Sequence, residues 1–161
     1  MRVGLGIDAH AFDAGEPLVL GGVQFPGEQG LAGHSDGDVL THALIDALLG
    51  AANLGDIGTL FPPDDDAFSG ISSLLLLSRA YGQIREARYE LVNADCVLIG
   101  ERPRIGERRE EMCLKLAETM GVEPVRVSVR ATTTDRLGFT GRGEGLAAQA
   151  VALIARSDAS K

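Results

Sequence analysis

The sequence predicts a single α/β domain of the α+β type, with helices covering one face of a mixed or antiparallel sheet. Its 161 residues are enough for one ordinary domain, and 45% hydrophobic with 24% charged residues is a globular composition. Segments with the period of a strand alternate with segments with the period of a helix. No internal repeat or low-complexity linker separates them, so we expect one domain over residues 1–161.

The first expected strand lies near the N-terminus, where apolar residues occupy alternate positions: Val3, Leu5 and Ile7. This period predicts that these three side chains are buried, with Gly4 and Gly6 on the other face. Asp8 and His10 continue the glycine face, because side chains two residues apart on a strand point the same way. A carboxylate and an imidazole therefore converge on one spot, which could hold a cation.

A hairpin and a long helix are expected next. Residues 17–26 indicate two short strands that turn at Gly21-Gly22. Ser35, with Asp38 three residues later, has the spacing of a capping box, so we expect the helix to begin near Ser35. The helix should end near residues 53–55.

The rest of the chain alternates between loops, helices and strands. In order, we expect a loop over 55–70, a leucine-rich helix within 71–88, a strand over 89–100, a loop over 101–106, a helix over 107–121 capped by Gly121, a strand over 124–133 and a last strand over 145–157. The final segment is also compatible with a helix, but a strand is favoured.

The first helix is apolar on two sides. Ile45 and Leu49 fall towards the face that carries Asp38, His42 and Asp46. A domain of this size has one core, so we expect a neighbouring subunit to cover this second face.

Charge and cysteine content exclude some classes of partner. Fifteen basic and 23 acidic side chains give a net charge of −8, which argues against a nucleic-acid or anionic-membrane surface. Cys96 and Cys113 are expected to be core thiols without a disulfide. With no secretory leader and no apolar run of membrane-spanning length, we expect a cytoplasmic protein.

Asp8, His10 and His42 form a candidate metal site. One carboxylate and two imidazoles suit a catalytic divalent ion with an open coordination position, and zinc is the leading candidate. The structural alternative is an ion pair at the end of a strand, with His42 as a solvated helix residue.

Three other segments have a functional and a structural interpretation. His34-Ser35, at the expected helix start, could bind an anion or simply cap the helix. Residues 131–145 combine hydroxyls with a glycine-rich turn that could hold phosphate, and Asp135 could bind a second, oxygen-preferring cation; such turns are also common without a ligand. Residues 60–68 could form a mobile lid or an acidic solvated loop.

Four spaced motifs resemble one family. They are "GIDAHAF", "GHSDGDVLTHALIDALLGAANLGDIGTLFP", "GERPRIG" and "ATTTDRLGFTGRGEG". In this order they resemble the 2-C-methyl-D-erythritol 2,4-cyclodiphosphate synthase family of the non-mevalonate isoprenoid pathway, over residues 4–154. Asp135 stands where members of that family often have glutamate.

The resemblance implies a role for each motif. Asp8, His10 and His42 would bind Zn²⁺, and His34 and Thr133 would stabilise the transition state. Residues 100–106 would hold the cytosine, residues 56–58 the methylerythritol, and residues 61–65 would close over the substrate. The implied substrate-binding residues are Asp8, His10, His34, Ser35, Asp56, Ile57, Gly58, Phe61, Pro62, Pro63, Asp64, Asp65, Gly100, Glu101, Arg102, Pro103, Arg104, Ile105, Gly106, Thr132, Thr133, Thr134, Asp135, Phe139 and Arg142.

The resemblance also implies a reaction and an assembly. The 2-phosphate of 4-diphosphocytidyl-2-C-methyl-D-erythritol 2-phosphate would attack the β-phosphorus and release CMP, with a second Mg²⁺ or Mn²⁺ on the diphosphate, held in part by Asp135. The protein would be a homotrimer with its sites between chains. Two alternatives stay open: a non-haem iron oxygenase, whose facial triad has the same ligand types, and a non-catalytic metal- or nucleotide-binding oligomer.

Overall fold

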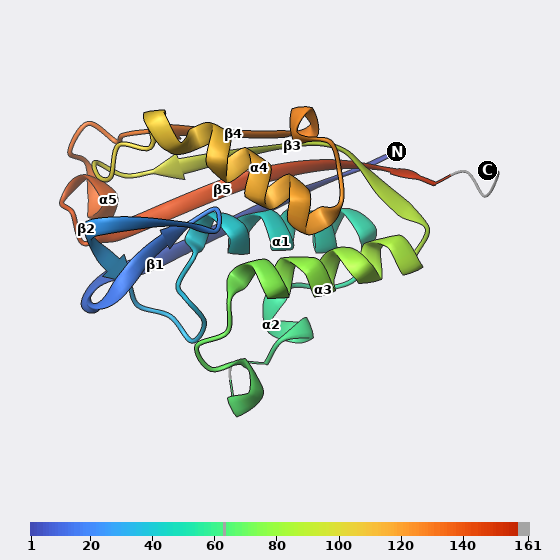
Figure 1. Ribbon diagram of the computed structural model, residues 1–161, viewed down its shortest axis with the longest axis horizontal. Coiled ribbons are helices and arrows are strands. Elements are labelled where there is room, and N and C mark those ends of the chain that lie inside the picture. Colours follow the sequence, from blue (N-terminus) through green and yellow to red (C-terminus); the bar gives the residue numbers. More distant parts are fainter. Residues whose placement is uncertain (63, 158–161) are drawn as a thin grey trace.

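The computed structural model describes residues 1–62 and 64–157 and contains one five-stranded sheet (Figure 1). The strand order is β2-β1-β5-β3-β4. The strands are β1 (Arg2–Leu20), β2 (Val23–Leu31), β3 (Tyr89–Ile99), β4 (Val127–Thr132) and β5 (Gly145–Arg156). Only β3 and β4 pair in parallel, and the other neighbours are antiparallel. The predicted mixed sheet is confirmed.

Three long helices cover one face of this sheet: α1 (Val39–Ala52), α3 (Ser73–Glu86) and α4 (Arg109–Met120). Figure 1 shows α3 on the side of α1 that faces away from the sheet. Two single-turn helices, α2 (Ile57–Leu60) and α5 (Gly138–Gly141), and three 3-10 turns (Asp66–Phe68, Gly106–Arg108 and Pro124–Arg126) complete the described elements. The predicted class, with helices over one face of the sheet, is therefore correct.

The two faces of β1 are the reverse of the prediction. Val3, Leu5 and Ile7 are 67%, 55% and 63% exposed, whereas Gly4 and Gly6 are buried under α1. A Cβ atom at Gly6 would lie 1.9 Å from a carbonyl oxygen of α1, and one at Gly4 would lie 2.0 Å from another. The glycines thus allow α1 to lie directly on the strand. The buried face of β1 is therefore the face on which α1 packs, and not the face that carries the more hydrophobic side chains.

Asp38, not Ser35, caps α1, so the predicted helix start is wrong. The buried Asp38 carboxylate accepts hydrogen bonds from the Thr41 backbone N–H (3.1 Å) and hydroxyl (2.7 Å). It also accepts the N–H groups of Gly21 (2.9 Å) and Gly22 (2.8 Å). One carboxylate therefore holds the β1–β2 turn against the start of α1. These long-range donors favour Asp38 over the locally plausible Ser35.

The second face of α1 is covered within the chain. Ile45 and Leu49 are fully buried, and α3 packs against α1. The prediction that a neighbouring subunit covers this face is therefore wrong, because the leucine-rich α3 performs that role. Exposed apolar side chains lie instead on the open face of the sheet, among them Val3, Leu5, Ile7 and Val151.

Most other predicted elements are confirmed. The hairpin turns at Gly21-Gly22, both with positive φ, and Gly121 caps α4 at φ 66°. The last segment is strand β5. The expected loop over 55–70 is only partly correct, because Asp56 caps the short helix α2 within it. Cys96 is buried, Cys113 is half-buried, and both are free thiols. No helix in residues 1–62 and 64–157 combines the length and apolarity that crossing a membrane requires.

Candidate functional site

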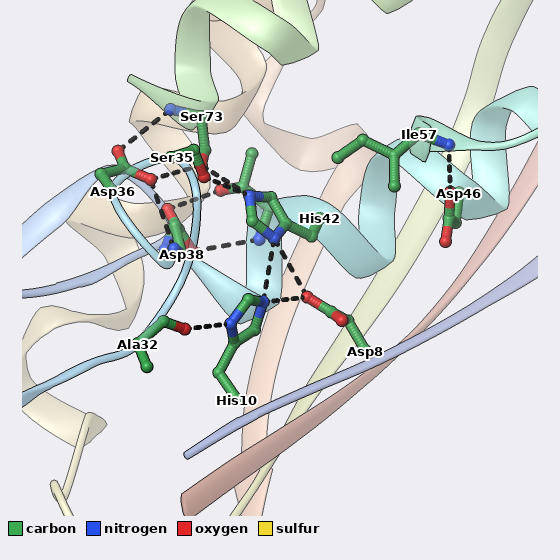
Figure 2. Close-up of polar contacts among 12 residues, drawn as sticks. Asp8, His10, Ala32, Ser35, Asp36, Asp38, His42, Asp46, Ile57 and Ser73 are labelled. Carbon is green, nitrogen blue, oxygen red and sulfur yellow. Dashed lines mark hydrogen bonds and ion pairs between the residues drawn. The ribbon is translucent and has the colours of Figure 1, made fainter. Parts of the chain in front are cut away.

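Asp8 and His10 of β1 meet His42 of α1 where the helix crosses the strand (Figure 2). Asp8 Oδ2 lies 2.7 Å from His10 Nε2 and 3.0 Å from His42 Nδ1. The two imidazole nitrogens are 3.2 Å apart. Three candidate ligand atoms therefore converge, as the sequence predicts, and His42 is not a solvated residue, since it is only 8% exposed.

The backbone fixes the proton of His10. Its Nδ1 forms a hydrogen bond with the carbonyl oxygen of Ala32. A carbonyl oxygen only accepts, so Nδ1 carries a hydrogen, and Nε2 is the nitrogen that faces Asp8 and His42 and is able to bind a cation there. A neutral imidazole nitrogen and a carboxylate oxygen aimed at the same point are the donor set of a divalent cation site.

The electrostatics of the cluster favour positive charge at that point. Burial raises the pKa of Asp8, but its hydrogen bonds to His10 and His42 outweigh this effect and lower the pKa to about 2. The hydrogen bond to Asp8 raises the pKa of His10, against the opposing effect of burial. Because the site stabilises an anionic Asp8 beside positive charge, its residues fit a divalent metal ion.

The cluster lies in a cavity of about 230 Å³. Eight of its lining residues are among the predicted site residues: Asp8, His10, His34, Ser35, His42, Ile57, Gly58 and Phe61. The other two lining residues are apolar: Phe68 is the last residue of the possible lid over 60–68 but was not selected as a site residue, and Leu76 was not predicted at all. The rings of Phe61 and Phe68 meet edge to face at 5.4 Å. Neither Phe68 nor Leu76 carries a sequence signal for a binding site, because an apolar side chain at either position resembles an ordinary core residue.

Two aspartates hold α2, whose residues Ile57 and Gly58 line this cavity. Asp56 accepts the Thr59 N–H at 2.7 Å and so caps α2. Asp46 of α1 accepts the Ile57 N–H at 2.8 Å (Figure 2). The sequence analysis placed Asp46 on this face of α1 but gave it no contact with α2. Burial raises the pKa of the Asp46 carboxyl, and its bond to Ile57 joins α2 to α1.

The comparisons with known proteins agree with this geometry. The model of the YgbB family matches residues 1–155. The chain belongs to the YgbB family. Among curated members, the 2-C-methyl-D-erythritol 2,4-cyclodiphosphate synthase of Rubrobacter xylanophilus is 58% identical over 159 residues, which are 97% of this chain and 96% of the relative. The synthase of the same name from Symbiobacterium thermophilum is 55% identical over 155 residues, which are 96% and 99% of the two chains.

A solved structure supports the same family. The IspF of Plasmodium falciparum, solved as a CDP complex, superposes with a TM-score of 0.84 at 29% identity, over 98% of this chain and 97% of that one. The fold of that structure therefore extends over nearly the whole of this chain.

A second group of predicted residues in this YgbB member lies elsewhere in the chain. Residues 100–106 and 132–135 follow β3 and β4, which are parallel neighbours, so the two segments meet at one edge. The Gly100 N–H donates to the carbonyl oxygen of Thr132 at 3.0 Å, and the Arg136 N–H donates to the Glu101 carboxylate at 3.2 Å. None of these residues lines the cavity at Asp8.

The remaining predicted residues divide between the two regions. Glu101, Arg102 and Arg142 line a separate cavity of about 330 Å³, and Arg142 pairs with Glu144 at 2.7 Å. Phe139, in α5, is 41% exposed and lines neither cavity. Pro62, Asp64 and Asp65 follow α2 without lining the first cavity, although His34 Nε2 lies 3.5 Å from the Asp65 carbonyl oxygen. Pro63 lies outside the described residues.

Proposed function

We propose that this chain is a 2-C-methyl-D-erythritol 2,4-cyclodiphosphate synthase of non-mevalonate isoprenoid precursor biosynthesis. It converts 4-diphosphocytidyl-2-C-methyl-D-erythritol 2-phosphate to the cyclic diphosphate and releases CMP. The observation that carries this proposal is the convergence of Asp8, His10 and His42 in a cavity whose other walls carry further residues expected for this function. The two free cysteines are compatible with action in the cytoplasm.

The reaction requires positioning more than a protein nucleophile. The 2-phosphate is largely dianionic at neutral pH, and it attacks the β-phosphorus as the bond to the CMP phosphate breaks. The chain's task is to hold a flexible polyol folded and to exclude water, and such positioning can contribute about 7–11 kcal/mol. The walls from α2 and the Phe61–Phe68 ring pair suit that task.

The cluster and the nearby polar groups would stabilise the charge of the reacting phosphates. When bound to Asp8, His10 and His42, a divalent ion, which we propose to be Zn²⁺, supplies a Lewis acid that weakens the repulsion between the two anions. We further propose that His34 and Thr133 stabilise the transition state by hydrogen bonding. Asp135 offers an exposed carboxylate oxygen of the kind that Mg²⁺ or Mn²⁺ prefers, which fits a second ion on the diphosphate.

We also propose a homotrimer in which each site is shared by two chains. Its support is the separation within one chain between the cavity at Asp8 and the segments 100–106 and 132–135. The exposed apolar side chains on the open sheet face, among them Leu5 and Ile7, offer the surface that subunits would bury. In this arrangement, one chain binds the methylerythritol portion and its neighbour binds the cytidine.

Neither alternative function is favoured. An iron oxygenase would use the same three ligands, but the two curated relatives described above are named cyclodiphosphate synthases. A non-catalytic binding protein would give Thr132–Asp135 no role.

The test of the proposed function is incubation of the purified protein with the diphosphocytidyl substrate and quantification of CMP. We expect CMP to form with Zn²⁺ and Mg²⁺ present and without dioxygen. Asp8→Asn, which keeps the shape but removes a ligand charge, should release little CMP. A protein that is fully loaded with zinc and releases no CMP would contradict the proposal.

A further inference from the structure

Two residues that the sequence analysis did not select lie directly behind His42. Ser73 is the first residue of α3 and is fully buried, and Asp36 belongs to the segment that leads into α1 (Figure 2). The Asp36 carboxylate accepts both the backbone N–H of Ser73, at 3.0 Å, and its hydroxyl. The Ser73 Oγ lies 2.9 Å from His42 Nε2. A carboxylate, a hydroxyl and an imidazole thus form one hydrogen-bonded chain.

The direction of each hydrogen bond follows from the groups involved. An ionised carboxylate only accepts, so the single hydroxyl proton of Ser73 points to Asp36. The Ser73 oxygen is then left as an acceptor towards His42, whose Nε2 must carry the proton. Nδ1 of the same ring is therefore the nitrogen left to bind a cation at the point that it shares with Asp8 and His10, whose nearest atoms lie 3.0 Å and 3.2 Å away.

Ser35 does not fix this direction by itself. Its Oγ also lies 2.9 Å from His42 Nε2, but it is free to donate or to accept there. Because the proton of Ser73 is committed to Asp36, Ser73 is the hydroxyl that selects the tautomer. The Oγ atoms of Ser35 and Ser73 are 3.4 Å apart, so both contact the same ring edge.

A purely structural role for Asp36 is the competing explanation. Ser72, at the N-cap position of α3, makes no side-chain capping bond, and Asp36 takes over this role through the Ser73 N–H. A cap, however, needs only that backbone N–H. The contact from the Ser73 hydroxyl to His42 contributes nothing to capping, so the two roles can be separated by removing the hydroxyl alone.

We propose that Ser73 and Asp36 are positioning residues of the metal centre, which hold His42 in the tautomer and orientation that direct Nδ1 at the metal. The proposal rests on the proposed function only for the identity of the ion. Groups that hold a ligand imidazole in this way typically change metal affinity by about 10–100-fold when they are removed. Asp36 acts on His42 through Ser73, and α3 is thereby tied to the site.

The first experiment measures the Kd for Zn²⁺ of the metal-free protein by competition with a chelator. Ser73→Ala should weaken zinc binding by about tenfold or more. The matched control is Ser72→Ala, which removes a neighbouring exposed hydroxyl that caps nothing and should leave the Kd unchanged. A Ser73→Ala protein that folds and keeps the wild-type Kd would overturn the proposal.

The second experiment asks whether Asp36 acts through Ser73. Asp36→Asn should also weaken zinc binding, because its amide can donate to the Ser73 oxygen and release the hydroxyl proton towards His42. In a Ser73→Ala background, the same change should have little further effect on the Kd. Additive effects would mean that Asp36 acts on the metal centre by a separate route, and would refute this part of the proposal.

A third measurement uses only the wild-type protein, so it remains informative even if the variants fail to fold. Nitrogen-15 NMR of the zinc-loaded wild type identifies which ring nitrogen of His42 carries the proton. We expect the proton on Nε2, where the Ser73 oxygen accepts it and protects it from exchange. A proton on Nδ1, or a wild type that binds no zinc, would overturn the inference. Loss of CMP release alone would count only against the proposed function, because none of these measurements uses the substrate.

Discussion

The two candidate regions differ in how completely one chain builds them. At the Asp8–His10–His42 cluster, hydrogen bonds arrive from the segment before α1 and from the start of α3, and His42 is buried. In the segment 132–135, hydroxyl contacts stay local: Thr133 and Asp135 contact each other at 3.4 Å, and both are exposed. The metal cluster is therefore pre-organised by the fold of one chain, whereas in the segment 132–135, the open half of the proposed shared site, the side-chain contacts are local.

The largest effect should come from removing a ligand in the pre-organised half. His42→Ala leaves two ligands, which cannot hold a catalytic metal, so the Kd for Zn²⁺ should rise by at least about a hundredfold. The control is His34→Ala, which removes an imidazole from the same cavity but not from the cluster. Chelator competition measures both. If His42→Ala kept the wild-type affinity for zinc, His42 would not be a metal ligand, and the contrast between the two regions would not hold.

The close packing of α1 on β1, which brings His42 to Asp8 and His10, provides the next test of pre-organisation. A Cβ at Gly6 would lie 1.9 Å from the Ala43 carbonyl oxygen, so Gly6→Ala must push α1 away from β1. We expect a loss of about 3 kcal/mol in the free energy of unfolding. Denaturant titration measures it.

Gly50→Ala is the matched control for that change. Gly50 is an exposed position of α1, and a Cβ there would meet nothing within 4 Å. It should stabilise the helix by about 0.5–1 kcal/mol. Equal effects of the two substitutions would show that α1 does not depend on the glycine face of β1.

Chain mixing tests whether the open half is completed by a neighbour. Asp8→Ala damages the metal half and Thr133→Ala the second half, so each variant alone should release little CMP. After unfolding and refolding together in equal amounts, about a quarter of the sites should combine two intact halves if chains assort randomly in a cyclic trimer. CMP release should recover to a comparable fraction. No recovery in demonstrated mixed oligomers would place both halves of each site in one chain.

The smallest expected effect lies in the open half. If Asp135 helps to hold a second cation, Asp135→Asn should raise the Mg²⁺ concentration for half-maximal CMP release by several-fold, about what loss of one carboxylate ligand implies, and leave zinc content unchanged. Asp135→Glu, which restores the residue common in the family, should keep or improve metal dependence. Unchanged magnesium dependence and turnover in Asp135→Asn would make Asp135 a structural residue at the end of β4.

Local patterns in the sequence were sufficient for most elements and for the convergence of Asp8 and His10, whereas the addition of His42 to the metal site depended on its residue type and on the family resemblance. The spacing of Asp8 and His10 depends only on the two-residue period of a strand. The leucine-rich α3, the Gly121 cap and the Gly21-Gly22 turn likewise depend on neighbours in sequence. Such features were predictable because their physical cause lies within a few residues.

Contacts between distant residues decided the rest. The choice of Asp38 over Ser35 as a cap depends on donors from the β1–β2 turn, and the buried face of β1 depends on how closely α1 approaches its glycines. Ser73 and Asp36 are separated by 37 residues, and nothing local to either indicates that they meet behind His42. The residue pattern was enough to predict most of the strands and helices and the side chains that could bind a metal. Which faces are buried and which groups contact His42 could not be predicted in this way, because burial and hydrogen-bond direction are set by the partners that folding brings together.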